Sequence, residues 1–582
     1  MHKGISVLVM SILLLASIFT YSQNKTLQVN LDSQTSHQQV TDSIGAAKLA
    51  NNVLHQKRSE GFLNILIQSQ NFRNDTFFYN ILLGKRYTQI HIRSHNLDSL
   101  YLPLESSFHL GLREFSEFQK SILDKYENNG YPFASISLQK NAVRSDTLSC
   151  DLIFYPFTQI RYDSLVYYGN SKISKKYISK YLGLEEGRLY NEENVSTIDK
   201  KLRNLPIMKL TRPSQVIFTR EKARIILYIE DVVTDRLDGV VGIAPNSNNS
   251  EGNNLLLTGE LNIELNNLFR SGKQLGIHWR NYLQRSQKLD VNFAYPYLFN
   301  TKIGINGELN LNKFDTLFLN VMNKLSFRYQ QKGNNYIEFY YQNIRSTLLS
   351  VDTNSIINRK LIPDNNPYRV DNYGLVAFSQ DLDYLQNPRR GYHIKADFSV
   401  GQKTILKNSE INAIKFINEN NNSLITVYNT VSLKSIRLDL KLSSSFFIPV
   451  KKRATIYQKL EFNGIFTDQV FFNELYNFGG YSSLRGFDEN ELFASKALLY
   501  NIEFRYLIGQ NSHVGLFMNA AAIEDKLRSD DLVYDTPVGF GALANIEVGK
   551  GVLSMAYALG SQQGNELQLS TAKFHFGIIN YF

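Results

Sequence analysis

One arginine stands in a segment of glycines and apolar residues, where a surface loop would normally carry more charge. The ten residues from Phe478 to Phe487 read FGGYSSLRGF, and Arg485 is the only charged residue among them. A guanidinium group presents a rigid fork of hydrogen-bond donors, and it needs a carboxylate when it loses water. The composition of this segment is therefore unlike that of an ordinary surface loop.

No catalytic constellation accompanies this arginine. The sequence contains no Gly-x-Ser-x-Gly, no His-Glu-x-x-His and no Gly-x-x-x-x-Gly-Lys-Ser/Thr motif. Its one cysteine, Cys150, excludes an internal disulfide framework and a zinc site built on several cysteines. We therefore expect no enzyme activity, no catalytic residue, no cofactor and no metal site.

Length and hydropathy limit the fold class. A chain of 582 residues is too long for a single core, so several domains are expected. The mean hydropathy of −0.26 excludes a helical membrane protein, whereas a β-barrel, with its polar interior, stays possible.

The net charge of +10 is spread along the chain without a run that would read as a nucleic-acid arm. Nucleic acid is therefore not an expected partner. Attraction to anionic lipid headgroups and ordinary solvated charge both explain the excess, and the sequence does not choose between them.

The first 23 residues read as a signal peptide. Lys3 supplies the positive start, the stretch from Ile5 to Phe19 is apolar, and small or polar residues follow up to a cleavage site near Ser22. No later apolar run reaches the roughly 18 residues of a membrane helix. An exported chain of this kind is either soluble or a β-barrel.

The N-terminal half reads as small α+β domains. We interpret residues 24–60 as a linker with a possible helix near 43–57, and residues 61–156 and 157–232 as two domains. In the second, apolar residues repeat at helical spacing around Tyr181 and again around Leu202, and strand-like segments flank both stretches.

Residues 233–582 show a different pattern, in which apolar and polar residues alternate and long connections alternate with short turns. This pattern predicts membrane-crossing β-strands that close into a barrel. The sixteen predicted strands are 235–245, 254–266, 272–283, 287–298, 302–314, 317–330, 335–346, 372–382, 391–402, 424–448, 453–466, 496–508, 512–523, 537–548, 550–560 and 571–582.

The run Leu484-Arg485-Gly486-Phe487 resembles the (V/I/L)-R-G-(F/Y) signature of the BamA/TamA superfamily of outer-membrane β-barrel proteins. The segment from Tyr500 to Arg505 resembles the strand after the loop that carries this signature. The resemblance implies α+β periplasmic POTRA-like domains followed by an all-β, 16-stranded antiparallel transmembrane β-barrel. The loop motif comprises Gly479, Gly480, Leu484, Arg485, Gly486 and Phe487.

In that superfamily the loop folds back into the barrel lumen, and its arginine pairs with acidic residues on the barrel wall. Carried over, Arg485 would meet Glu503. The other partner lies in a Phe-x-Asp-x-Gly motif, which here reads Phe517-Met518-Asn519-Ala520-Ala521. Asn519 replaces the acid, so the resemblance implies Glu503, Phe517 and Asn519 as lumen partners with one charge fewer.

The last segment resembles the signal by which outer-membrane barrels are recognised for assembly. His575, Gly577 and Phe582 fit that signal, whereas Asn580 stands where an apolar residue is usual. The resemblance also implies a weakly paired seam between the first and last strands that could open laterally.

The function implied by the resemblance is assistance to the insertion, assembly or translocation of outer-membrane and surface polypeptides, as in TamA-like factors. The expected location is the bacterial outer membrane, with the N-terminal domains in the periplasm. The expected partners are client polypeptides, outer-membrane lipids, and a periplasmic or inner-membrane protein bound by the POTRA-like domains.

Two other functions stay open from the sequence. One is a two-partner-secretion-type translocator, which a helix near 43–57 lying inside the barrel would favour. The other is a passive channel with a structural periplasmic domain. The role of Arg485 is also open, because it could act in client insertion or only brace its loop.

Overall fold

The computed structural model describes residues 25–31, 34–40, 42–95, 107–144, 146–232, 234–245, 255–283, 286–331, 334–385, 387–417, 423–488, 490–525, 533–549, 551–562 and 571–580. The predicted signal peptide, residues 1–23, and Phe582 lie outside these ranges. In the described ranges, no helix is both long and apolar enough to cross a membrane.

Two compact units make up the chain. The first runs to Arg161 and also takes in Leu189–Glu193 and Thr219–Lys222, and the second comprises the remaining residues up to Phe582.

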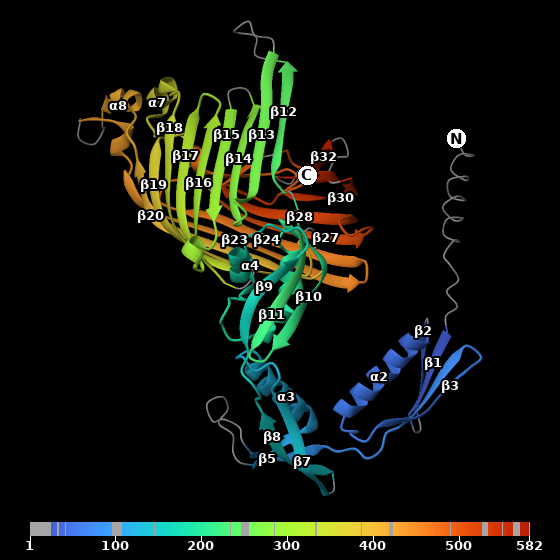
Figure 1. Ribbon diagram of the computed structural model, residues 1–582. Coiled ribbons are helices and arrows are strands. Elements are labelled where there is room, and N and C mark those ends of the chain that lie inside the picture. The colour runs from blue at the N-terminus through green and yellow to red at the C-terminus, as the bar shows by residue number, and fades with distance from the viewer. Residues whose placement is uncertain are drawn as a thin grey trace, which may run out of the picture. The chain divides into compact units, whose positions relative to one another are not determined.

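The first small domain is built from strands β1 (Lys25–Leu31), β2 (Gln34–Val40), β3 (Leu66–Arg73) and β4 (Thr76–Leu82) with helix α2 (Ser43–Ser59). The sheet has the order β2-β1-β4-β3, in which β1 and β4 are parallel (Figure 1). The Asp42 side chain accepts a 2.6 Å hydrogen bond from the amide of Gly45 and so caps the start of α2.

This domain corrects the interpretation of residues 24–60 as a linker. The predicted helix is present, but the residues before it form two strands, and α2 packs on the sheet through Ala46, Ala50 and Leu54. Strand β2 reads QTSHQQV, which has none of the apolar alternation that marks a strand, whereas Leu27, Val29 and Leu31 of β1 do alternate with polar residues.

The second small domain repeats the same topology. Strands β5 (Gln89–His95), β6 (Ser107–Gly111), β7 (Ser135–Arg144) and β8 (Thr147–Tyr155) form a sheet of order β6-β5-β8-β7, with helix α3 (Leu112–Glu127) between β6 and β7 in sequence. The predicted boundary at residue 61 is wrong, because β3 and β4 complete the sheet of the first domain.

The third small domain matches the segment predicted at 157–232. It contains β9 (Arg161–Tyr168), α4 (Lys175–Leu182), α5 (Glu192–Ser196), α6 (Ile198–Arg203), β10 (Met208–Thr219) and β11 (Lys222–Asp231), and its sheet has the order β10-β11-β9. Its helices bury Ile178, Leu182 and Leu202. Within the described residues, three small domains therefore precede the large sheet, whereas the sequence left their number open between two and three.

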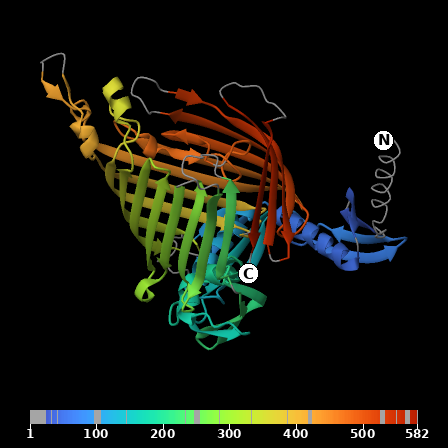
Figure 2. The same cartoon turned by 90° about the horizontal axis from the view of Figure 1, so that it is seen from above.

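The rest of the chain forms one antiparallel sheet of 17 strands that curves into a barrel (Figures 1 and 2). The 3-residue strand β29 (Val533–Asp535) pairs with β28 beside β30, which leaves the sixteen strands that the alternation predicted. These strands are β12 (Arg236–Pro245), β13 (Leu255–Leu268), β14 (Lys273–Leu283), β15 (Ser286–Tyr295), β16 (Ile303–Phe314), β17 (Phe318–Gln330), β18 (Tyr336–Leu348), β19 (Tyr368–Leu382), β20 (Gly391–Ile405), β23 (Lys434–Lys451), β24 (Ala454–Phe466), β27 (Lys496–Leu507), β28 (His513–Asp525), β30 (Val538–Val548), β31 (Gly551–Ser561) and β32 (Lys573–Asn580).

The largest difference from a predicted strand boundary concerns the strand predicted at 424–448. The strand predicted at 424–448 begins only at Lys434, because the preceding residues form the two-residue strand β22 (Leu424–Ile425) and the 3-10 turn η3 (Val427–Asn429). Val427 and Tyr428 of η3 are buried in an apolar core shared with the neighbouring loops, whereas Leu424 is 67% exposed.

The two faces of the sheet differ in chemistry. On β28, Leu516 and Met518 are 66% and 55% exposed on the outside, whereas Phe517 and Asn519 between and beside them are 4% and 1% exposed. Strands β17 to β20, β24, β27 and β31 likewise carry exposed Phe, Tyr or Leu on the outside. An apolar outer band of this kind suits a sheet surrounded by lipid.

The sheet begins with β12 and ends with β32, and no backbone ladder joins these two strands within the described ranges. Each of them is hydrogen-bonded on one side only, to β13 and to β31. The described residues therefore leave the two ends of the sheet as free edges.

Loops at one end of the barrel form a shared apolar core (Figure 1). The loops contain α7 (Thr353–Arg359), α8 (Ser409–Ala413), β21 (Phe416–Ile417), β22, η3 and η4 (Phe472–Glu474). Together with the ends of β19 and β20 they bury Ile356, Tyr368, Val370, Ile405, Ile411, Val427, Tyr428 and Phe471. This core fixes the start of the loop that carries the motif.

The single cysteine gives a direct test of the second small domain. Cys150 is fully buried in β8, and burial, with the neighbouring Asp151 carboxylate, raises the pKa of its thiol to about 11. We expect a maleimide to label the folded protein very slowly at neutral pH and quickly in urea, and the folded-state rate to rise only as the pH approaches that pKa. The variant Cys150→Ser is the blank, and rapid labelling of the folded protein at neutral pH would contradict the burial.

Candidate functional site

The candidate site is centred on the segment that joins β24 to β27, which we call the motif loop (residues 467–488 and 490–495). It starts with η4, and a short hairpin of β25 (Tyr476–Phe478) and β26 (Leu492–Ala494) carries its tip. The tip is the stretch from Gly479 to Asp488, and it contains the Leu-Arg-Gly-Phe run. Gly479, Gly480 and Gly486 all have positive φ, which lets the backbone fold back tightly.

Arg485 is buried, and its guanidinium lies against the barrel wall. Its Nη1 donates to Glu503 Oε1 on β27 at 2.7 Å. The guanidinium carbon is 4.7 Å from the ring centre of Phe517 and 4.9 Å from that of Tyr481. The structure thus brings together three of the residues that the resemblance implied, by an ion pair and by cation–π contacts.

Glu503 is shared between two arginines. Its other oxygen, Oε2, accepts from Arg505 Nε at 2.7 Å, while Oε1 also accepts from Asn501 Nδ2 at 3.0 Å. Arg505 in turn stacks over Tyr457, with its guanidinium carbon 4.0 Å from the ring centre. One carboxylate therefore pairs with two guanidinium groups, and these three side chains together carry one excess positive charge.

Asn519, at the position of the expected acid, makes no hydrogen bond through either side-chain atom within the described residues, although both atoms are buried. It lies opposite Asn501 and Gly539 on the neighbouring strands. The structure therefore places Asn519 beside the arginine site without joining it. Arg485 Nε is also buried without a hydrogen-bond partner within those residues.

The tip of the motif loop lies directly on the last strands of the sheet. A Cβ on Gly539 would lie 2.0 Å from the Arg485 carbonyl oxygen, and one on Gly560 would lie 2.5 Å from the Gly486 carbonyl oxygen. Only glycine at these two positions lets the loop backbone approach β30 and β31 so closely. Both contacts were missed from the sequence, because a single glycine in a strand does not indicate which segment packs against it.

Two polar contacts join the tip to β32. The Gly486 amide donates to His575 Nε2 at 3.4 Å, and Lys573 Nζ lies 2.8 Å from Asp488 Oδ2. His575, which the sequence assigned to the assembly signal, thus contacts the motif loop. Gly577 is not brought to the loop, and a Cβ added there would meet nothing within 4 Å.

Apolar packing supports the tip. Leu484 and Phe487 are buried in a cluster with Phe478, Leu492 and residues of the barrel wall. Ala521, which stands where the superfamily motif has a glycine, belongs to the same cluster. The loop motif residues therefore hold the tip in place from both sides of Arg485.

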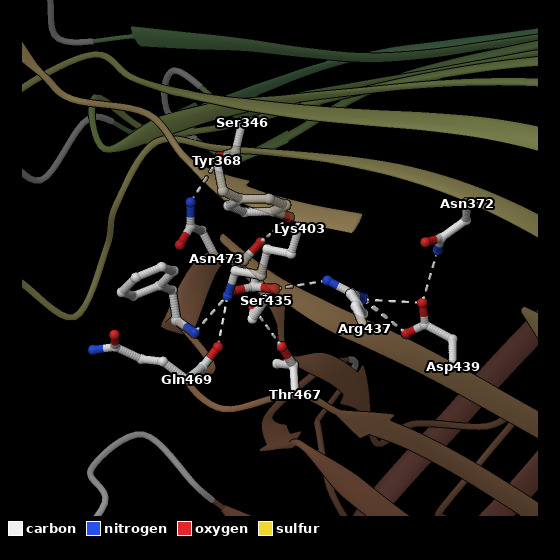
Figure 3. Close-up of polar contacts among 12 residues, drawn as sticks. Ser346, Tyr368, Asn372, Lys403, Ser435, Arg437, Asp439, Thr467, Gln469 and Asn473 are labelled. Carbon is white, nitrogen blue, oxygen red and sulfur yellow. Dashed lines mark hydrogen bonds and ion pairs between the residues drawn. The ribbon is translucent and has the colours of Figure 1, made fainter. Parts of the chain in front are cut away.

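A second buried charged group holds the start of the motif loop, and sequence reasoning missed it. It joins Glu474 of η4 to Lys403 on β20 and to Arg437 on β23 (Figure 3). No sequence motif marks these residues. The only signal is that all three are charged residues in otherwise ordinary strand and loop sequence.

The chemistry of the site is ion pairing and packing. In the part of the chain that the structure describes, no group of three or more His, Cys, Asp or Glu residues could hold a metal ion. What the arrangement can do is fix a loop inside a barrel and hold it against the terminal strands.

No protein-family model matches the chain, and no curated protein matches it. Among solved structures, CdiB from Escherichia coli is 14% identical with a TM-score of 0.51, and the match covers 92% of this chain and 97% of that one. CdiB from Acinetobacter baumannii is 11% identical with a TM-score of 0.47, over 96% of this chain and 90% of the other. BamA from Haemophilus ducreyi lacking POTRA domains 1–3 is 15% identical with a TM-score of 0.42, over 80% and 92%.

The fold and the site define the class of the protein: small α+β domains followed by an antiparallel β-barrel of sixteen long strands that contains a folded-in loop. The likeness to CdiB from Escherichia coli shows the same fold along nearly the whole of both chains. The fold predicted from the resemblance to the BamA/TamA superfamily is thereby confirmed.

Asn519 provides a test of the charge balance. We expect Asn519→Asp to stabilise the protein by about 1–2 kcal/mol, because the new carboxylate lies beside the excess positive charge of Arg485 and Arg505. The measurement is urea unfolding in detergent micelles. In an Arg485→Ala background the same substitution should lose most of this gain, since the new carboxylate then has one cation fewer nearby. A destabilisation of equal size in both backgrounds would contradict the charge argument.

Proposed function

We propose that the protein assists the insertion, assembly or translocation of outer-membrane and surface polypeptides, as TamA-like factors do. The observation that carries the proposal is the motif loop, which is paired to the barrel wall through Arg485 and Glu503 and lies on the last strand of a sheet whose ends are unpaired within the described residues. A loop in this position can influence how the terminal strand is held.

The proposed location is the outer membrane, with the small domains in the periplasm. The apolar outer face of the barrel supports the membrane location, because so many exposed Phe, Tyr and Leu side chains would be unfavourable in water. Outer-membrane lipids are then the surroundings of the barrel.

The small domains are proposed to bind extended client segments. Their sheets have edge strands, β2 and β3 in the first domain and β6 and β7 in the second. An extended peptide can add to such an edge through main-chain hydrogen bonds. A periplasmic or inner-membrane partner would use the same edges or the adjoining helices.

The proposed seam lies between β12 and β32. Unpaired backbone groups are costly in lipid, so an entering client strand would satisfy its hydrogen bonds on either free edge. No nucleotide or cofactor is needed for this step, because the client exchanges one set of hydrogen bonds for another. Gly577 on β32 offers no side chain to resist the exchange.

The two-partner-secretion function stays compatible with the fold, although the helix near 43–57 does not add to its support. That function would be favoured by a plug helix near 43–57, but α2 packs through Ala46, Ala50 and Leu54 on the sheet of the first small domain. The passive-channel function stays an outcome of the test below.

Depletion followed by quantitative outer-membrane proteomics tests the function. We expect the abundance of several unrelated barrel proteins to fall on depletion. Wild-type protein should restore them, whereas Arg485→Ala and Glu503→Ala should restore them only in part, because each removes one side of the ion pair. Matched controls are Arg345→Ala and Glu410→Ala, which change exposed residues outside the site.

The other outcomes of this experiment are equally informative. Loss of one secreted protein alone would replace the proposal with a dedicated translocator. An unchanged outer membrane would leave the passive channel as the better explanation.

A further inference from the structure

The ion pair of Arg485 does not account for the most deeply buried charges of the barrel. Lys403 and Glu474 have side chains that are 1% and 0% exposed, and they form a direct ion pair. Glu474 also accepts from Arg437 Nη1 at 2.6 Å, and Arg437 pairs with Asp439 at 2.9 Å (Figure 3). Buried charges are costly unless they are paired, so this group needs all of its members.

The group is electrically balanced only when the motif loop is in place. Lys403 and Arg437 are two cations on β20 and β23, and Asp439 on β23 supplies one anion. Glu474, from η4 of the motif loop, supplies the second anion. Lys403 Nζ also donates to the Gln469 carbonyl oxygen at 2.6 Å, so this lysine is bound to the motif loop at two points.

The neighbouring residue adds a neutral attachment. Asn473 Nδ2 donates to Ser346 Oγ on β18 at 2.7 Å and to the Asn366 carbonyl oxygen at 3.0 Å. The Asn473 carbonyl oxygen accepts from Asn320 Nδ2 on β17 at 2.8 Å. We call Asn473 and Glu474 together the stem anchor. With a further hydrogen bond from Tyr368 of β19 to the Asn473 carbonyl oxygen, at 3.4 Å, the stem anchor attaches the loop to five strands of the wall, β17, β18, β19, β20 and β23.

The tip also reaches β32, and its contacts with that strand are weaker than the contacts of the stem anchor. Its ion pair with β32 joins side chains that are 37% exposed in Lys573 and 68% exposed in Asp488. The hydrogen bond from Gly486 to His575 is long, at 3.4 Å. Exposed pairs of this kind contribute little, whereas removing a partner from a buried pair is strongly destabilising.

We propose that the stem anchor is a positioning site, and that it makes the motif loop a strap between β17–β23 and the terminal strand β32. The stem stays fixed while the weaker tip contacts with β32 break and re-form. The structural role of the strap does not depend on the proposed function. Its biological role does rest on the proposed function, since the strap would then govern how readily β32 is released to a client strand. Glu474 and Asn473 act through the loop and touch no client.

Hydrogen exchange of the full-length protein in lipid nanodiscs tests the strap. The test variant is Lys403→Met combined with Glu474→Gln, which removes one cation and one anion and leaves the pair of Arg437 and Asp439. The control is Lys407→Met combined with Glu410→Gln, the same two changes at exposed positions of a neighbouring loop. We expect roughly tenfold faster exchange in residues 476–488 and 573–580 of the test variant, with β14–β17 unchanged.

A tip variant separates the strap from a general loosening. Asp488→Asn should speed exchange in residues 573–580 while residues 471–478 stay protected, because the stem anchor is intact. If the stem variant leaves exchange in residues 573–580 equal to that of the control, the strap is refuted.

A second stem variant covers the case in which the first does not fold. Asn473→Ala leaves every charge in place and removes the side-chain attachment to β18, so it should give the same pattern to a smaller degree. If both stem variants fail to fold, the stem anchor is a folding requirement, and its role as a positioning site is refuted.

The exchange measurement needs no client, so it is independent of the proposed function. The expected exchange pattern with an unchanged outer-membrane proteome on depletion would leave the strap standing and remove the proposed function. A changed outer-membrane proteome on depletion, together with hydrogen exchange in the stem variants equal to that of the control, would support the proposed function and refute the strap.

Discussion

Every backbone amide in a lipid-embedded sheet needs a partner, and the rest of this structure depends on that constraint. Lipid offers no hydrogen bonds, so only a closed or nearly closed sheet can cross it. Each strand between β13 and β31 is paired on both sides, whereas β12 and β32 are each paired on one side within the described residues. Opening the barrel between those two strands would therefore break fewer backbone hydrogen bonds than opening it between any other pair of neighbouring strands.

The motif loop lies where this constraint is weakest. The backbone of its tip lies close to β30 at Gly539 and to β31 at Gly560, because these glycines have no side chain. The tip also contacts β32 through His575. The loop is thus in contact with a strand whose hydrogen bonds are incomplete on one side in the described part of the chain. A change in the position of the loop would therefore change the contacts of β32, whatever the loop itself binds.

Two clusters of charged residues inside the barrel hold the motif loop, one at its tip and one at its stem. At the tip, one carboxylate, Glu503, serves both Arg485 and Arg505, and Asn519 supplies no charge. At the stem, the two cations Lys403 and Arg437 meet two carboxylates. The balanced group lies at the stem and the unbalanced one at the tip.

The sequence predicted the barrel well, because strands in lipid must alternate. Outward residues such as Leu516 and Met518 must be apolar, and the inward residues between them must suit the lumen, so the pattern survives in a single sequence. The first small domain was missed because its strand β1 pairs in parallel with β4, from which it is separated by a helix, and β2 is polar. Leu27, Val29 and Leu31 of β1 do alternate with polar residues, but one strand of seven residues does not by itself indicate a domain.

The candidate site was predictable only where a motif names it. Arg485 and its loop were found through the Leu-Arg-Gly-Phe run, but Glu474 meets Lys403, 71 residues earlier in the chain, and no spacing rule connects them. A loop carboxylate of this kind is read from sequence as solvated. It becomes informative only once the fold shows that it is buried, because a buried carboxylate must have its cations beside it. The strength of the stem anchor therefore follows from the burial of its charged side chains, and burial cannot be read from the sequence of a loop.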